Sequence, residues 1–350
     1  MQAAVKKVYM SILVSVLVLL TCVATTYAWV GIISNSTFEE FALNVNVSNL
    51  KEYGIEISLD GINFGTEINS VDLKKQILLN YGYSEEQLSS EETIDYAFSR
   101  FSLEACTNNP DFVNHKMSNF TTLDGGSTRK YFKFDIYVSA YKVYETGSVT
   151  DFKLDTFLRG DILSGTVSAY TLFNEFTYPS NVISDTIRPN QVISSTKVNS
   201  ESATRLAIEK YEVVEKYKPE SYTESSRATD LIIYQGGTQN PSYDDTTGIY
   251  SFGGVLDNDT NVALYDYNLF YQENYTVPSW AIERGEKELE INEGNSQIID
   301  SDLESEQVGI NDMMKLTFYF WFEGWDSDCF SVVNQKPVSI NLNFSTSYRD

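Results

Sequence analysis

Histidine and recognisable catalytic motifs are almost absent from this sequence, and their absence excludes several classes of enzyme. His115, in the polar stretch FVNHKMSN, is the only histidine among 350 residues. Catalytic dyads and triads that need histidine, and zinc sites with several histidines, are therefore excluded. The sequence also contains no HExxH, P-loop, GxSxG or strand-linked GxGxxG motif. The common hydrolase and nucleotide-binding sites are not expected.

Basic side chains are few relative to acidic ones. The chain has 25 lysines and arginines against 49 acids, which gives a formal charge of −24. Such a surface repels the phosphate backbone of nucleic acids and anionic lipid headgroups. Nucleic acid is therefore not expected as a partner, whereas an acidic surface is ordinary for a soluble secreted protein.

Proline is scarce, whereas tyrosine and phenylalanine are abundant. The chain has 7 prolines against 24 tyrosines and 20 phenylalanines. Aromatic side chains favour strands over helices, and a composition so rich in them argues against disorder. We therefore expect a folded protein that consists mainly of β-structure.

Apolar and polar residues alternate with a period of two in many segments. The clearest examples are residues 131–144 and 315–322, and the same pattern occurs at residues 42–48, 55–60 and 339–344. Each such strand has one apolar face and one polar face. Sheets built from these strands bury their apolar faces against each other. The prediction is a mainly β protein with an antiparallel, jelly-roll-like β-sandwich.

Helical spacing predicts one short helical insertion. Residues 71–83 and 89–101 have the apolar spacing of two short helices, and Ser89 and Ser90 provide an N-terminal cap for the second. Residues 201–214 fit either an amphipathic helix or a strand, and their periodicity does not decide between the two.

The N-terminus has the pattern of an export signal. Lys6 and Lys7 precede the apolar run YMSILVSVLVLLTCVA, and TTYAW offers small residues for cleavage before Trp29. An uncleaved anchor is an alternative, because residues 8–33 carry no charge and are long enough to span a bilayer. A lipidation site at Cys22 is a third alternative. In each case the two lysines keep the N-terminus inside and send the rest of the chain outside.

These features predict two parts in the chain. Residues 1–28 are expected to form a signal peptide or a membrane-anchor helix. Residues 29–350 contain no Pro/Gly/Ser linker and are expected to form a single domain. The protein is expected to be secreted or held at the cell surface, with membrane contact only through its N-terminal segment.

Two cysteines remain after the signal. In an oxidising compartment Cys106 and Cys329 are candidates for a disulfide, which would close a long loop. Two buried thiols are the alternative, because the sequence does not show whether their Cα atoms lie within reach.

Acidic side chains offer two further chemistries, neither of which we assign. A pair of carboxylates could hydrolyse a glycosidic bond, but the many acids of the chain give no basis for choosing a pair. Two oxygen-rich clusters have the donor type that calcium prefers: Asp257, Asn258 and Asp259, and Asp244, Asp245 and Thr246. Both also fit solvated turns on an acidic surface. No metal or cofactor is predicted.

A strand followed by a turn is predicted near the C-terminus, in the stretch FYFWFEGWDSDCF. The strand KLTFYFW is interrupted at Glu323 and Gly324, and Asp326 and Asp328 can accept hydrogen bonds from the N–H groups of the turn. The residues that define this strand-turn signature are Trp321, Glu323, Gly324, Trp325, Asp326 and Cys329.

This signature and three other stretches resemble a known family. Together with TYAWV, ISLDGINFG and SATRLAI, it is similar to the TasA and camelysin family of exported surface proteins from low-GC Gram-positive bacteria. The resemblance implies a jelly-roll β-sandwich and export through a dedicated signal peptidase. It also implies a strand at residues 201–214, and the larger size of this chain implies insertions near residues 71–105 and 215–305.

TasA-like members form fibres of the biofilm matrix, in which the mature N-terminal strand completes the sheet of a neighbour. The donor here would be residues 29–38. Its apolar residues are Trp29, Val30, Ile32 and Ile33. An ordinary first strand that pairs within its own subunit is the alternative for this segment.

Three functions stay open. The main prediction is an exported structural protein of the cell surface that associates with itself in fibres or contacts neighbouring surface proteins. The first alternative is an adhesin or carbohydrate-binding module, with Trp280 in VPSWAIE as the aromatic contact. The second is a camelysin-like metallopeptidase, although no zinc triad can be assigned to residues of this sequence.

Overall fold

The structure is a computed structural model of the whole chain. It describes residues 36–37, 42–48, 53–118, 120–122, 131–142, 153–159, 162–165, 167–177, 192–223, 225–236, 242–244, 249–251, 254, 276–290, 308–329 and 338–348. The expected signal or anchor at residues 1–28 lies outside these ranges, as do Trp29, Val30, Ile32 and Ile33.

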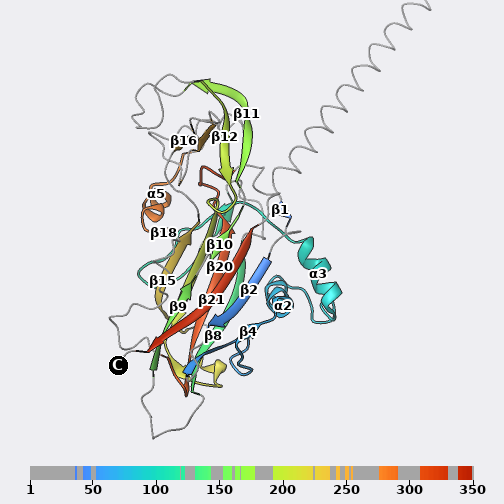
Figure 1. Cartoon of the computed structure of the whole chain (residues 1–350), viewed down its shortest axis with the longest axis vertical. Coiled ribbons are helices and arrows are strands. Elements are labelled where there is room, and N and C mark those ends of the chain that lie inside the picture. Colours follow the sequence, from blue (N-terminus) through green and yellow to red (C-terminus); the bar gives the residue numbers. More distant parts are fainter. Residues whose placement is uncertain are drawn as a thin grey trace, which may run out of the picture.

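The largest sheet has seven strands, and its centre is formed by β13 and β20 (Figure 1). Its strands in spatial order are β18 (Leu289–Glu290), β15 (Ala228–Gln235), β13 (Thr204–Tyr211), β20 (Asp312–Phe322), β8 (Phe132–Lys142) and β3 (Tyr53–Ser58), and β14 (Val214–Glu215) also pairs with β20. The strand implied at residues 201–214 is therefore confirmed as β13.

A second sheet has six strands and contains both β2 and the C-terminal strand. Its strands in order are β19 (Val308–Gly309), β9 (Lys153–Arg159), β21 (Ser339–Tyr348), β2 (Ala42–Ser48) and β4 (Glu67–Ile68), and β10 (Leu163–Ser164) also pairs with β21. The pair β2 and β21 is parallel.

The remaining strands form three smaller sheets. A four-stranded sheet at one end of the molecule contains β11 (Val167–Thr177), β12 (Val192–Asn199), β17 (Ile249–Ser251) and β16 (Ser242–Asp244) (Figure 1). Two-stranded sheets are formed by β1 (Ser36–Thr37) with β5 (Ser102–Leu103), and by β6 (Cys106–Thr107) with β7 (Thr121–Thr122).

The prediction of antiparallel sheets is confirmed for most strand pairs and is wrong for three of them. The pairs β2–β21, β15–β18 and β12–β17 are parallel. Parallel strands cannot be joined by a tight hairpin, so they need a longer connection. Each of these pairs joins strands that are separated by at least one other element along the chain. The alternation of apolar residues does not reveal such pairings.

Both predicted helices are confirmed. They are α2 (Ser70–Asn80) and α3 (Glu91–Ser99), which follow one another between β4 and β5. Ser90 caps α3, because its hydroxyl accepts the N–H of Thr93 while the Thr93 hydroxyl accepts the N–H of Ser90. The structure also contains α5 (Ser279–Gly285) and the short 3₁₀ helix η1 (Pro219–Ser221).

One hydrophobic core contains residues of both large sheets. Leu43 and Val45 of β2 belong to it, as do Phe318 and Phe320 of β20. In β2 the intervening residues are exposed, so the predicted alternation is confirmed in this strand. Burial of these apolar faces supplies most of the favourable free energy of folding.

The predicted polar outer face is wrong for the two central strands of the seven-stranded sheet. All but the last residue of β13 and all but two residues of β20 are buried. A second hydrophobic cluster explains this burial, because Cys106 and Met117, from the segment that follows α3, pack there against Ala207 and Trp321. Phe120 adds to this cover, and its ring stands edge-on to that of Trp321 at a centroid distance of 5.5 Å.

Candidate functional site

The strand-turn signature forms a buried polar turn at the end of β20. Glu323 organises it, because one carboxylate oxygen accepts the Trp321 indole N–H at 3.0 Å and the other accepts the Trp325 backbone N–H at 3.1 Å. Asp326 accepts the backbone N–H of Asp328 at 2.9 Å. The predicted role of Asp326 as a local acceptor in the turn is confirmed.

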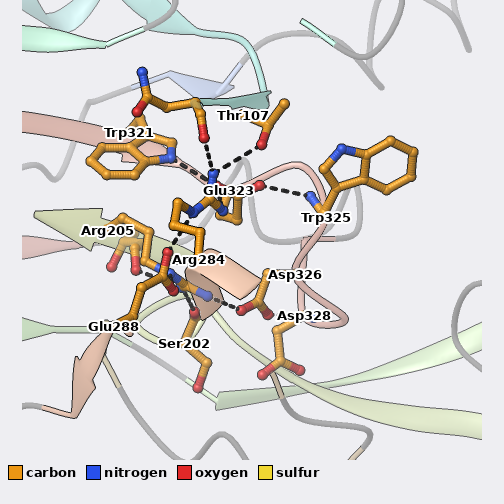
Figure 2. Close-up of polar contacts among 12 residues, drawn as sticks. Thr107, Ser202, Arg205, Arg284, Glu288, Trp321, Glu323, Trp325, Asp326 and Asp328 are labelled. Atoms are coloured by element: carbon orange, nitrogen blue, oxygen red, sulfur yellow. Dashed lines mark hydrogen bonds and ion pairs between the residues drawn. The ribbon is translucent and has the colours of Figure 1, made fainter. Parts of the chain in front are cut away.

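Two buried arginines join this turn to β13 and α5 (Figure 2). Arg205, in β13, donates through Nε to Glu288 at 2.5 Å and through Nη2 to Asp326 at 2.7 Å. Arg284, in α5, donates through Nε to the other oxygen of Glu288 at 2.8 Å and forms an ion pair with Glu323. All five side chains are almost completely buried. We call Arg205, Arg284, Glu288, Glu323, Asp326 and Asp328 the buried ionic network.

The remaining donors of the two arginines bind backbone and hydroxyl oxygens. Arg205 Nη1 donates to the carbonyl groups of Ser202 and Thr204. Arg284 Nη1 donates to the Thr107 hydroxyl and to the carbonyl group of Asn108. The network therefore also fixes the segments before β13 and after β6, because a buried guanidinium must have its donors satisfied.

Neighbouring opposite charges shift the pKa values of Glu288 and Arg205 in favour of their ionised forms. Burial alone would raise the pKa of Glu288, but Arg205 and Arg284 hold it below its usual value. Burial alone would lower the pKa of Arg205, but Glu288, Asp326 and Glu323 raise it above its usual range. Glu288 and Arg205 therefore stay ionised at neutral pH.

The two aspartates of the turn behave differently. Burial raises the pKa of Asp326 to about 6, although Arg205 acts in the opposite direction. Burial and the neighbouring Asp326 carboxylate raise the pKa of Asp328 well above its usual value. Burial also raises the pKa of the Cys329 thiol. Carboxyl groups with raised pKa values are candidates for function, but both are at most 2% exposed, so a substrate cannot reach them.

Sequence reasoning missed Arg205, Arg284 and Glu288. Arg205 carried the available signal, since it interrupts the apolar stretch SATRLAI. A charged residue in a strand with apolar neighbours on both sides requires a buried partner. The partners lie 83 and 121 positions away along the chain, so the sequence could not identify them.

The structure does not contain the disulfide considered for Cys106 and Cys329. Both are buried thiols, and they belong to different hydrophobic clusters. Cys106 packs with Trp321 on the outer face of the seven-stranded sheet, whereas Cys329 packs with the shared core. This separation explains why the second alternative, two buried thiols, is the one observed.

The other residues singled out in the sequence are scattered. His115 lies in the turn between Asp111 and Lys116 and has a positive φ of 54°. Trp280 lies half-buried in the first turn of α5. Asp244 ends β16, and the other members of the two oxygen-rich clusters lie outside the described residues: Asp245, Thr246, Asp257, Asn258 and Asp259.

A single chain segment pairs with both large sheets along one side, where it covers part of each outer strand. Gly65 pairs with Ile57 of β3, with hydrogen bonds of 2.8 and 2.9 Å in both directions. The chain then forms β4, which pairs with Val45 and Asn46 of β2, and continues directly into α2. The segment therefore crosses from one sheet to the other and pairs with part of each edge.

On the opposite side, two longer strands have edges that are only partly paired within the described residues. Among the described residues, β18 covers only Tyr234 and Gln235 of β15, and β19 covers only Lys153 and Leu154 of β9. The Leu231 N–H in β15 donates to the Asp230 side chain at 2.8 Å. This N–H is therefore directed away from the ladder with β13, towards the open edge.

Comparisons with protein-family models, with curated proteins and with solved structures find no match to this chain. In the parts of the chain that the structure describes, no helix has the length and apolar character needed to cross a membrane. The same residues contain no group of three or more His, Cys, Asp or Glu side chains arranged to hold a metal ion.

Proposed function

We propose that this chain is an exported structural protein of the cell surface, folded as a jelly-roll-like β-sandwich, which assembles into fibres by strand addition. The mainly β architecture and the core common to both large sheets support this fold. The basic and apolar pattern of the first 28 residues supports export.

The open edge of β15 is the observation that carries the proposal. From Ala228 to Ile233 this strand pairs on one side only, within the described residues. An unpaired edge presents free N–H and C=O groups that a strand from another chain can bind. An incoming strand would replace Asp230 as the acceptor of the Leu231 N–H.

The proposed donor is the segment of residues 29–35, which is shorter than the expected 29–38 because Ser36 and Thr37 pair within their own chain. It directly precedes β1, which pairs with β5 of the same chain. The C-terminal end of the donor is thus fixed to its own subunit. Its seven residues would extend over about 23 Å, which suffices to cover the stretch of β15 from Ala228 to Ile233 that pairs on one side only among the described residues.

Electron microscopy of the purified chain tests this function. The intact chain should form filaments, and deletion of residues 29–35 should abolish them while β1 is retained. A lysine on a strand edge opposes strand addition, so Thr229→Lys in β15 should also reduce filament formation. Thr223→Lys, at an exposed position outside the strand, is the matched control. Monomers from the intact chain, or filaments from the deletion variant, would refute the proposal.

An adhesin or carbohydrate-binding module remains the second proposal, and the exposure of Tyr217 favours it. This side chain is 58% exposed, and its backbone has a positive φ of 65°. Its ring stands edge-on to Phe64 at 5.8 Å, with the Lys216 ammonium 5.0 Å from the Tyr217 ring centroid. Strained backbone at an exposed aromatic suggests a binding role. Loss of glycan-array binding in Tyr217→Ala, with Tyr96→Ala as the exposed control, would support it.

No observation on the described residues favours the metallopeptidase alternative.

A further inference from the structure

The four-stranded sheet is connected to the rest of the molecule through segments that meet in one place. Gly165 precedes β11, residues 199–204 join β12 to β13, Gly236 precedes β16 and Gly254 follows β17. A Cβ atom on Gly165 would lie 2.5 Å from the Glu201 nitrogen, and one on Gly236 would lie 2.6 Å from the Glu201 carbonyl oxygen. These backbones are therefore in direct contact.

The turn after β20 is hydrogen-bonded to the same segments. The Ser327 N–H donates to the Gly254 carbonyl group at 2.8 Å, and the Glu323 N–H donates to the Ala203 carbonyl group at 2.8 Å. We call the turn at residues 323–329, together with the segments that it contacts, the junction. Figure 2 shows Ser202 of this junction beside Arg205, with Asp326 and Asp328 nearby.

The interior of the junction holds more acids than bases. The buried ionic network has two guanidinium groups and four carboxyl groups. Ionisation of all six would leave an excess of two negative charges in a site closed to water, which is costly. A proton on one of the carboxyl groups removes part of this excess.

Asp328 is the acid of the buried ionic network whose negative charge is least balanced by hydrogen bonds or ion pairs. It is 1% exposed, and neither carboxyl oxygen has a hydrogen-bond partner of normal geometry within the described chain. Arg205 directs its two ion pairs to Glu288 and Asp326 instead. Ser202 and the backbone of Asn199 lie close enough to favour the ionised form of Asp328, but burial and Asp326 outweigh them.

We propose that the junction is a proton-dependent latch, in which a proton held by Asp326 and Asp328 fixes the four-stranded sheet to the rest of the molecule. Loss of this proton loosens the turn and the segments bound to it. The ionisable groups that face the two aspartates in the described structure are Arg205 from β13, Glu323 and Cys329 from the turn, and Glu288 after α5, which is paired with Arg284.

The pKa values give the direction of the effect. The folded pKa values of Asp326 and Asp328 lie above the ordinary value of 3.8. Their contribution to stability is complete below that value and is lost as the pH rises, for Asp326 through about 6. Glu288 acts in the opposite sense, since its pKa lies below 4.5 and its contribution is lost only as the pH falls below that value. The junction should therefore be most stable at mildly acidic pH.

Hydrogen exchange followed by mass spectrometry tests the latch on the full chain. Protection of peptides covering residues 199–204 and 323–329, corrected for intrinsic exchange rates, should fall by about tenfold or more between about pH 5.5 and about pH 8. Asp328→Asn imitates the protonated acid, so it should raise protection at the higher pH and reduce the change. Asp312→Asn, at the opposite end of β20, is the matched control and should behave as the unaltered chain.

Three outcomes would overturn the proposal. Equal protection at both pH values in the unaltered chain would show that no proton controls the junction. The same result for Asp328→Asn as for Asp312→Asn would remove Asp328 from the latch. Restoration of protection at the higher pH by millimolar calcium would assign the site to a cation instead.

Discussion

At the scale of single residues, the buried ionic network depends most on Glu288. This carboxylate binds both Arg205 and Arg284, so its removal leaves two buried guanidinium groups with fewer partners. Glu288→Ala should therefore lower the free energy of unfolding by about 3–5 kcal/mol, as measured by urea denaturation near neutral pH. Glu286→Ala, at an exposed position two residues earlier, should change it little. Equal effects of the two substitutions would contradict the assignment.

The two buried cysteines give a second prediction at this scale. In the structure both are thiols, and burial raises the pKa of Cys329, which lowers its reactivity. Iodoacetamide should therefore leave Cys329 unmodified in the native chain. After denaturation without a reductant, both Cys106 and Cys329 should be alkylated, as detected by peptide mass spectrometry. A disulfide-linked peptide pair that joins Cys106 to Cys329 would contradict this prediction.

At the scale of elements, the capping of α3 can be tested separately from packing. Ser90 and Thr93 exchange hydrogen bonds at the start of this helix. Ser90→Ala should lower the free energy of unfolding by about 1 kcal/mol. Ser89→Ala removes the same hydroxyl one residue earlier, outside the capping box, and should have a smaller effect. Thermal denaturation of the two variants distinguishes the positions.

The alternation of apolar and polar residues predicted the strands that have one face on the core and the other face in water. Residues 42–48 and 339–344 alternate because one face of each strand meets the core and the other meets water, so β2 and β21 could be predicted. Their parallel pairing could not, because it joins opposite ends of the chain. The burial of both faces of β13 and β20 could not be predicted from their own sequences either, because the outer face is covered by Phe120 and Met117 from a distant segment.

The same limit applies to the candidate site. The sequence indicated that Asp326 would accept hydrogen bonds within its own turn, and this local contact is present. The ion pair of Asp326 with Arg205 spans 121 positions, and no local pattern encodes it. A turn that was expected to have only a structural role is therefore also part of a buried network of charges.

At the scale of the whole molecule, the outer strands on both sides of the two large sheets are only partly paired within the described residues. On one side Gly65 and β4 pair with parts of β3 and β2. On the opposite side, among the residues described, β18 and β19 each pair with two residues of β15 and β9. The stretch of β15 from Ala228 to Ile233, which pairs on one side only among the described residues, would give each subunit an acceptor edge. Head-to-tail addition of this kind produces open filaments when the rotation between subunits does not close a ring.

Photo-cross-linking between subunits tests this central claim most directly. A photoreactive amino acid would replace Ile32, and equal amounts of isotopically labelled and unlabelled chains would be mixed before assembly. Mass spectrometry should then find cross-links that join a labelled to an unlabelled chain, with residue 32 attached to residues 228–233 of β15. Cross-links confined to single chains, or links between chains that avoid β15, would contradict strand addition at this edge.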